Sequence, residues 1–253
     1  MNTKRNIISI VIIAIIFTAC NNSSYDQNYP TTKIKTSIEN SVVINTKTDT
    51  RFSKQKGKFI DIRDNKSYRW VKIGNQIWMA DNFAYNNMDN GSWVYNNDKT
   101  FSGVFGYLYD WKTAIELAPK GWHLPTDQEW EQMISYLKEN TYSYDGIKGS
   151  NNIAKSMIQP LLWFESDVEG SVGNKDYSEK INTSGFSALA GGYRNNNGEY
   201  KRAGVYGYWW SATEGDEIGA YCRSIYYKGK TIERGDFYTN DKTSGYSVRY
   251  VKN

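Results

Sequence analysis

The sequence predicts an α+β domain, because helical patterns in the middle of the chain lie between groups of short strands. Runs typical of short strands occur within 58–79 and again, between polar loops, after residue 185. Two stretches between these runs space their apolar residues as one face of a helix does. We therefore expect two main helices between two groups of short strands.

The chain begins with the features of a secretory leader. Lys4 and Arg5 precede an apolar run at 7–17, and small residues follow before Cys20. The run is shorter than the about 20 apolar residues that cross a membrane. The segment resembles the lipobox of bacterial lipoproteins, although Phe17 stands where that motif has Leu. The resemblance implies cleavage before Cys20 and a lipid on its thiol. An ordinary signal peptide and an uncleaved anchor are the alternatives.

Three segments follow from this interpretation. Residues 1–19 form the leader, 20–57 a tether, and 58–253 the folded domain. The tether is rich in Asn, Ser, Thr and Lys, a composition typical of disorder, although residues 42–44 could form a short strand. A flexible tether of this length would hold the domain on the order of 30 Å from the membrane.

Charge and cysteine content limit the function classes. Loss of Lys4 and Arg5 with the leader reduces the 31 basic residues by two, against 27 acidic residues. This near-balance argues against a nucleic-acid partner. The chain has two cysteines, so a lipid on Cys20 leaves Cys222 without a disulfide partner. Cys222 is then expected to be a buried, small apolar side chain.

The N-terminal part of the domain reads as strands. Residues 59–63 form the first predicted strand, and a turn-like segment follows. Residues 68–73 and 76–79 are separated by Gly74-Asn75, which indicates a hairpin. Residues 81–103 are rich in Asn, Asp and Tyr and are expected to form a loop.

Two main helices come next. The first spans 110–118 and would place Trp111, Ala114, Ile115 and Ala118 on one face. The second begins after Thr126, whose spacing to Glu129 is that of a capping box. Its apolar face consists of Trp130, Met133, Ile134 and Leu137, and Asn140 would end it.

Short segments complete the predicted domain. Residues 153–158 could form a short helix. After Gly185 the sequence predicts short strands at 186–189, 206–210, 220–227, 231–234 and 247–251. We expect Trp209 and Trp210 to lie in the core.

Five ordered motifs resemble the Fibrobacter succinogenes major paralogous domain, a family of exported bacterial proteins. They cover residues 71–82, 121–126, 186–194, 207–214 and 245–249. The resemblance extends over about residues 57–253. It implies a C-type-lectin-like fold, related to the formylglycine-generating enzymes. In that fold two main helices flank a small, mostly antiparallel sheet, the chain ends pair, and long loops carry ligand contacts. The stretch 195–246 is also similar to the variable proteins of diversity-generating retroelements.

The sequence contains few residues that are suited to catalysis or to metal binding. His123 is the single histidine, which excludes three-histidine metal sites, and we expect it to be hydrogen-bonded and structural. Formylglycine-generating enzymes use a copper-binding cysteine pair, whereas Cys222 stands alone. Strand alternation would point Arg223 away from that thiol. Glu214, Asp216 and Glu217 are interpreted as a solvated acidic loop. We therefore expect no catalytic residue, no metal site and no cofactor.

Polar and aromatic residues near loops and strand ends indicate a binding surface instead, because such residues give adaptable contact area. The candidates are Asn195, Asn196, Asn197, Tyr200, Tyr206, Tyr221, Arg223, Tyr226, Tyr227, Tyr238 and Asn240.

The resulting hypothesis is a lipid-anchored, non-catalytic binding or adhesion protein of the outer membrane, of the kind found in Bacteroidota, with a protein or glycan ligand. The membrane face is left open, because Asn21 follows Cys20 where surface lipoproteins tend to carry acidic residues. The alternative is an enzyme related to the formylglycine-generating group, which requires an exposed and reactive Cys222.

Overall fold

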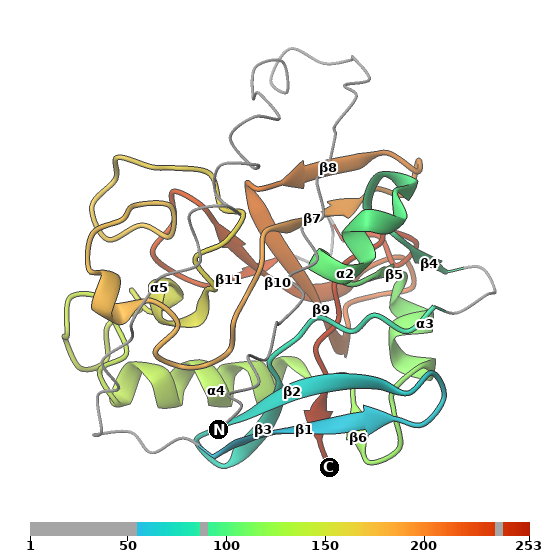
Figure 1. Ribbon diagram of the computed structural model, residues 1–253, viewed down its shortest axis with the longest axis horizontal. Helices are drawn as coiled ribbons and strands as arrows, with labels where there is room; N and C mark the ends of the chain where they lie inside the picture. The colour runs from blue at the N-terminus through green and yellow to red at the C-terminus, as the bar shows by residue number, and fades with distance from the viewer. Residues whose placement is uncertain (1–54, 87–90, 236–239) are drawn as a thin grey trace, which may run out of the picture. The chain divides into compact units, whose positions relative to one another are not determined.

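The structure is a computed structural model that describes residues 55–86, 91–235 and 240–253. This part of the chain mixes helices and strands, with more strand than helix, and its sheets are mostly antiparallel (Figure 1). The predicted leader, lipid site at Cys20 and strand at 42–44 lie outside the described residues. Within the described ranges no helix is long and apolar enough to cross a bilayer.

The first sheet joins the beginning and the end of the domain. It has the strand order β1-β2-β3-β12-β6, and β12 pairs antiparallel with both β3 and β6. The predicted hairpin is confirmed: Ile73 pairs with Gln76, and Gly74 takes the left-handed conformation of the turn. The bounds are β1 Lys56–Asp61, β2 Lys66–Ile73, β3 Gln76–Met79, β6 Trp122–His123 and β12 Val251–Lys252.

The second sheet has the strand order β11-β10-β9-β7-β8. Its pairs are antiparallel except for β7 with β9, which is parallel. A third sheet contains only β4 and β5. The bounds are β4 Ser92–Trp93, β5 Leu108–Tyr109, β7 Gly191–Arg194, β8 Tyr200–Ala203, β9 Tyr206–Glu214, β10 Ala220–Tyr226 and β11 Glu233–Gly235.

Helix α4, Asp127–Glu139, is confirmed in detail. Thr126 and Glu129 form both hydrogen bonds of the capping box, and Asn140 is the C-cap. The four predicted apolar residues of this helix are buried. The remaining helices are α2 Ser102–Phe105, α3 Trp111–Glu116 and α5 Ala154–Met157, with 3-10 turns at Tyr95–Asn97, Lys99–Phe101 and Ser178–Lys180.

Several predictions about secondary structure were wrong. Helix α3 is shorter than 110–118, with Asp110 as its N-cap and Leu117 as its C-cap, and Ile115 is 40% exposed rather than buried. Residues 186–189 form only one isolated bridge, and Ser187 takes a left-handed conformation. The single small sheet is replaced by two five-stranded sheets, and in the described chain only α4 is a long helix.

The core has two clusters, and β9 separates them. Trp209 packs with Trp78, Trp130 and Phe186 in the first cluster. Its neighbour Trp210 lies in the second cluster with the buried tyrosines of the opposite face. Both indoles are fully buried, which confirms the prediction that they belong to the core.

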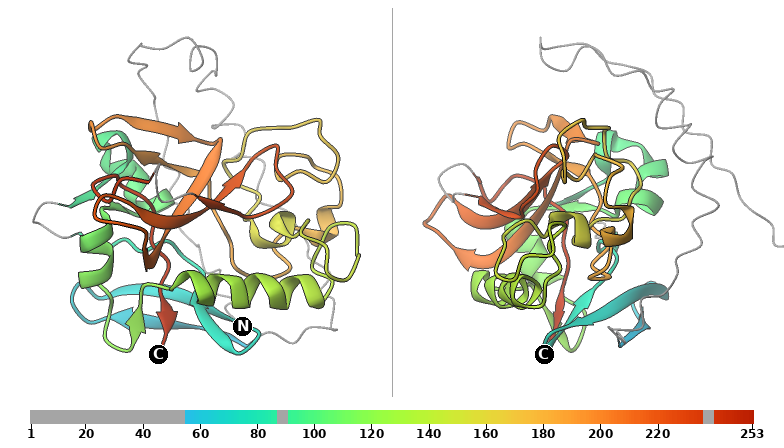
Figure 2. Two further views of the ribbon diagram at one scale, coloured as in Figure 1. Left: turned by 180° about the vertical axis from the view of Figure 1, so that it is seen from behind. Right: turned by 90° about the vertical axis from the view of Figure 1, so that its left-hand side faces the viewer.

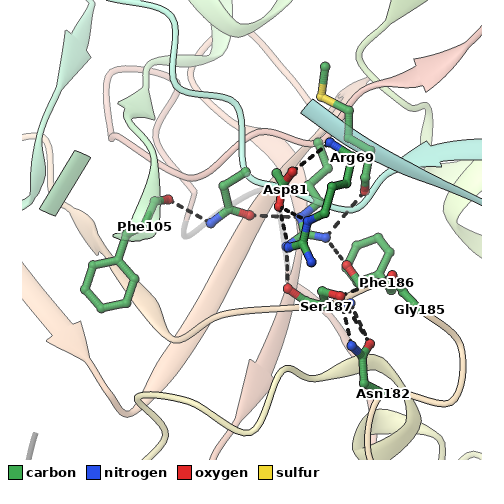
Figure 3. A network of polar contacts seen from close by, with 10 residues as sticks. Arg69, Asp81, Phe105, Asn182, Gly185, Phe186 and Ser187 are labelled. Carbon is green, nitrogen blue, oxygen red and sulfur yellow. Dashed lines mark hydrogen bonds and ion pairs between the residues drawn. The ribbon is translucent and has the colours of Figure 1, made fainter. Parts of the chain in front are cut away.

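A buried polar network ties these clusters together (Figure 3). Arg249 is fully buried, and its Nε donates to Asn82 Oδ1 at 2.9 Å. Trp209 Nε1 donates to the same oxygen at 3.0 Å. The Arg249 guanidinium also donates to the carbonyl oxygens of Phe186 and Ser187. Burial lowers the pKa of Arg249 to about 9, so the group still carries its charge at neutral pH.

On the other side of this network, Asn82 Nδ2 donates to the Phe105 carbonyl oxygen at 2.9 Å. Figure 3 shows Phe105 and Ser187 approaching from opposite sides, with the Arg69–Asp81 ion pair beside them. We call Asn82 and Arg249, with the groups that they bind, the Asn82–Arg249 network. It connects four of the five motifs that carry the family resemblance.

Removal of the Arg249 guanidinium should strongly destabilise the domain. Arg249→Met would leave the carbonyl oxygens of Phe186 and Ser187 buried without donors, and an unpaired buried polar group costs about 1–3 kcal/mol. We expect a loss of at least about 3 kcal/mol in the free energy of unfolding, measured by urea denaturation. Lys252→Met, at an exposed position nearby in sequence, is the control and should change stability by less than about 0.5 kcal/mol. Equal effects of the two substitutions would contradict a structural role for the network.

Candidate functional site

One face of the second sheet carries a row of stacked tyrosines. Tyr206, Tyr208 and Trp210 alternate along β9 and so share a face. Tyr226 of β10 lies opposite Tyr206, and these two rings stack with centroids 4.6 Å apart. Tyr206 and Tyr208 stack at 5.2 Å. We call the following residues the tyrosine ladder: Tyr193, Tyr206, Tyr208, Tyr226 and Tyr246.

The ladder combines a buried base with half-buried outer rings. Tyr246 is buried and stacks on Tyr208, with ring centroids 5.3 Å apart. Its ring centroid lies 4.2 Å from that of Trp210. Its hydroxyl donates to Asn240 Oδ1 at 3.0 Å. The other four rings are partly open to solvent. Because the inner ring is fixed by packing and a hydrogen bond, the outer rings are held in defined positions.

Several rings of the ladder stack on one another, both along β9 and between β9 and β10. The rings of Tyr206 and Tyr208 are nearly parallel, with an interplanar angle of 18°. Burial raises the pKa of both hydroxyls, so they are neutral at physiological pH. The exposed Arg202 places its guanidinium 5.2 Å from the Tyr206 ring and adds a positive charge at the rim.

An asparagine-rich turn lies beside the ladder, between β7 and β8. Asn196 and Asn197 are exposed, as expected, and Asn195 is half-buried. Asn196 Nδ2 donates to Asp241 Oδ2 at 3.0 Å. Tyr200 on β8 turns towards another loop, where its hydroxyl donates to Asn97 Oδ1 at 2.7 Å. The turn is adjacent to the ladder because Tyr193 belongs to β7.

Three predicted ligand contacts are buried instead. Arg223 is 1% exposed, Tyr227 8% and Asn240 5%, so none of them can form a ligand surface. Arg223 faces α4, where its guanidinium forms ion pairs with Asp127 and Glu131. These carboxylates lie on a separate element, which explains why the position of Arg223 was not evident from its own strand.

Two other candidates are not part of the ladder. Tyr221 is half-buried under the guanidinium of Arg234, 3.8 Å above its ring. Arg234 Nε also contacts Asp127 Oδ2 at 2.7 Å, which places this pair beside α4. Tyr238 lies outside the described residues.

The sequence interpretation missed Tyr193, Tyr208 and Tyr246 of the ladder, and Arg202 at its rim. Tyr208 is two positions from Tyr206, so strand alternation was the signal that could have placed them on one face. It was overlooked because Tyr208 directly precedes the tryptophan pair, which was assigned to the core. Tyr193 was missed because β7 was not predicted.

Cys222 is unsuited to nucleophilic chemistry. Its side chain is buried among the aromatic residues of the second cluster, as expected, and burial raises the pKa of the thiol to about 12. Arg223 points to the opposite side of β10, towards α4, which confirms the predicted alternation. A thiol that remains protonated and covered is a poor nucleophile.

His123 contacts both Asn253 and Glu129 of helix α4 through its ring nitrogens. Its Nε2 lies 2.7 Å from Glu129 Oε1, and its Nδ1 lies 2.6 Å from Asn253 Oδ1. Burial opposes ionisation of Glu129, but hydrogen bonds from Thr126 and His123 outweigh it and lower its pKa. His123 is therefore hydrogen-bonded and structural, as expected.

Lys242 binds to the acidic loop at 214–217. The ammonium group of Lys242 contacts the Glu214 carboxylate and lies 2.5 Å from the Asp216 carbonyl oxygen. It also lies 4.9 Å from the centroid of the Trp111 ring. Elsewhere in the described residues, no group of three His, Cys, Asp or Glu side chains is arranged to hold a metal ion.

Comparison with known proteins gives one match. A family model described as the Fibrobacter succinogenes major domain matches residues 71–252. No curated protein and no solved structure matches the chain.

Cys222 should be inert in the folded protein. Because its pKa is raised, the thiol stays protonated at neutral pH, and burial also blocks access. Iodoacetamide at pH 7.5 (roughly one unit below the pKa of a free thiol) should label Cys222 only after denaturation, as measured by mass spectrometry of Cys20→Ser protein. The Tyr246→Ala variant, which uncovers one side of the thiol, should be labelled faster. Labelling of the folded, unsubstituted domain as fast as a free thiol would contradict this.

Proposed function

This chain belongs to the Fibrobacter succinogenes major domain family, and we propose that it is a lipid-anchored, non-catalytic binding protein of the cell envelope. The observation that carries the proposal is the tyrosine ladder with its rigid base, its rim cation Arg202 and the neighbouring asparagine turn. Tyrosine, arginine and asparagine are residue types that give binding surfaces most of their contact energy and adaptability.

A protein ligand fits the ladder better than a glycan does. Sugar rings stack on open aromatic faces, whereas the Tyr206 ring already stacks with the rings of Tyr208 and Tyr226. The ladder and its rim offer partly exposed tyrosine rings, phenol hydroxyls and a guanidinium, which suit the hydrogen-bonding groups of a polypeptide surface. We therefore propose a protein ligand bound through the ladder and the turn at Asn195–Asn197.

The finer fold proposal is a C-type-lectin-like domain. Two observations support it: β12 near the C-terminus pairs with β3 near the start of the domain, and the long segment between α5 and β7 contains little regular structure. That segment is held by the buried Lys155, whose ammonium donates to the carbonyl oxygens of Asn174 and Asp176.

The location proposed for the protein is the outer membrane, with a lipid on Cys20. The basic start, the short apolar run and the cysteine at its end support this proposal. The enzyme alternative is less favoured, because its nucleophile would be the buried Cys222.

The proposal is tested by capturing ligands and then substituting the ladder. Mature chain, beginning at Cys20, would be used in pull-downs from cell-envelope extracts and on a glycan array. For a captured protein, Tyr206→Ala and Tyr226→Ala should each weaken binding by about thirtyfold, the effect of a hot-spot residue, measured by surface plasmon resonance. Tyr136→Ala, at a half-buried tyrosine of α4, is the matched control and should bind normally. Blank results in both assays, or full binding by the ladder variants, would contradict the proposal.

A further inference from the structure

Positive charge is concentrated in the first hairpin of the domain. Residues 56–73 contain six Lys and Arg but only two Asp, whereas residues 74–253 contain 18 basic and 22 acidic residues. The two parts therefore have net charges of opposite sign. Because the excess positive charge lies in one hairpin, an anionic surface would attract that end of the domain in particular.

Two lysines and two isoleucines form an exposed strip on this hairpin. Lys56, Lys58 and Ile60 alternate along β1 and share one face, and Ile62 follows in the turn. Ile60 is 61% exposed and Ile62 86% exposed, and both lysines are exposed. We call these four residues the β1 strip.

Three other cations of the hairpin are already used within the domain, but those of the strip are not. Arg63 pairs with Asp61 at 2.6 Å, and Arg69 pairs with Asp81 at 2.5 Å. Lys66 donates to the Ala84 carbonyl oxygen at 2.6 Å. In the described part of the chain no carboxylate pairs with Lys56 or Lys58. Their ammonium groups are therefore available to an external anion.

We propose that the β1 strip rests on an anionic phospholipid surface, with Lys56 and Lys58 at the headgroups and Ile60 and Ile62 in the interfacial region. Basic side chains beside exposed apolar ones are the combination that binds such surfaces. The inference rests on the proposed membrane anchor, because the chain from Cys20 enters the domain at β1. A contact that is weak in solution becomes significant when a tether keeps it close to the membrane.

The arrangement of the domain agrees with such docking. The β1–β2 hairpin lies at one end, and β7 and β8 lie at the other, in all three views (Figures 1 and 2). A strip in contact with the bilayer would therefore direct the turn at Asn195–Asn197 away from it. Docking would orient the binding face without any rearrangement of the domain.

A second copy of the chain is the competing occupant, because β1 is an edge strand and could extend a sheet. Lysines on an edge strand oppose this pairing, since two copies would bring like charges together. The lipid surface attracts the same lysines, so the charge pattern favours lipid over a second copy.

The test uses chain from residue 20 onward carrying Cys20→Ser, so that no lipid assists binding. Its partition onto vesicles of phosphatidylcholine alone, and of phosphatidylcholine mixed with phosphatidylglycerol, is measured by sedimentation. Binding is expected only to the anionic vesicles, and it should weaken as salt is added. The double variant Lys56→Glu/Lys58→Glu should lower the partition coefficient at least about twentyfold, since each lysine near an anionic surface contributes roughly fivefold.

Two further variants identify the cause of any loss. Ile60→Ser/Ile62→Ser should weaken binding while leaving its dependence on salt unchanged. Lys148→Glu/Lys175→Glu, at exposed lysines elsewhere, makes the same change in net charge and should bind as the unsubstituted chain does. Circular dichroism would confirm that each variant is folded.

The outcomes separate this inference from the proposed function. Absence of binding to anionic vesicles, or an equal loss in the Lys148/Lys175 control, would overturn the β1 strip. Dimerisation that the strip variants abolish, without vesicle binding, would assign the strip to a second copy. Tyr206→Ala should leave vesicle binding intact, so failure of ligand capture and failure of membrane docking remain distinguishable. Mass spectrometry of Cys20 in the native host tests the anchor by itself.

Discussion

The Asn82–Arg249 network is the interaction on which the position of the proposed binding face depends. One amide oxygen accepts hydrogen bonds from both Trp209 and Arg249, and the guanidinium also fixes the backbone at Phe186 and Ser187. Because Trp209 is held on one side of β9, strand alternation forces Tyr208 and Trp210 to the other side. A buried charge without a carboxylate partner is acceptable here because carbonyl and amide oxygens accept its hydrogen bonds. The network thus determines which residues of β9 face solvent.

The sequence predicted elements whose signals are local and missed those that depend on distant partners. Helix α4 was predictable because its capping box and apolar face lie within one stretch. The β2–β3 hairpin was predictable from its turn. The segment around Ser187 was misread as a strand. Its left-handed backbone is held by Asn182, five residues away, and by Arg249, 62 residues away. Strand β7 was missed because Gly192 also takes a positive φ, which strand patterns do not anticipate.

The candidate site was predictable in residue type but only partly in position. Tyr206 and Tyr226 were chosen as aromatic residues near strand ends, and the structure stacks them together. Arg223 was chosen for the same reason, yet the carboxylates of α4 bury it. Its environment is determined by packing between a strand and a helix that are far apart in sequence. The sequence pattern of one strand shows which residues share a face. Which of the two faces is buried depends on the element that packs against it in the tertiary fold.

The two faces of β9 have separate roles: one carries the tyrosine ladder, and the other packs on the Asn82–Arg249 network. The ladder rings stabilise one another by stacking, while the Asn82–Arg249 network acts through Trp209 on the opposite face. Substitution of an outer ring such as Tyr226 therefore removes surface contacts but no buried hydrogen bond of the network. Substitutions far from such networks usually cost little stability. A surface built in this way can accept different side chains, and hence different ligands, while the backbone beneath it keeps its geometry.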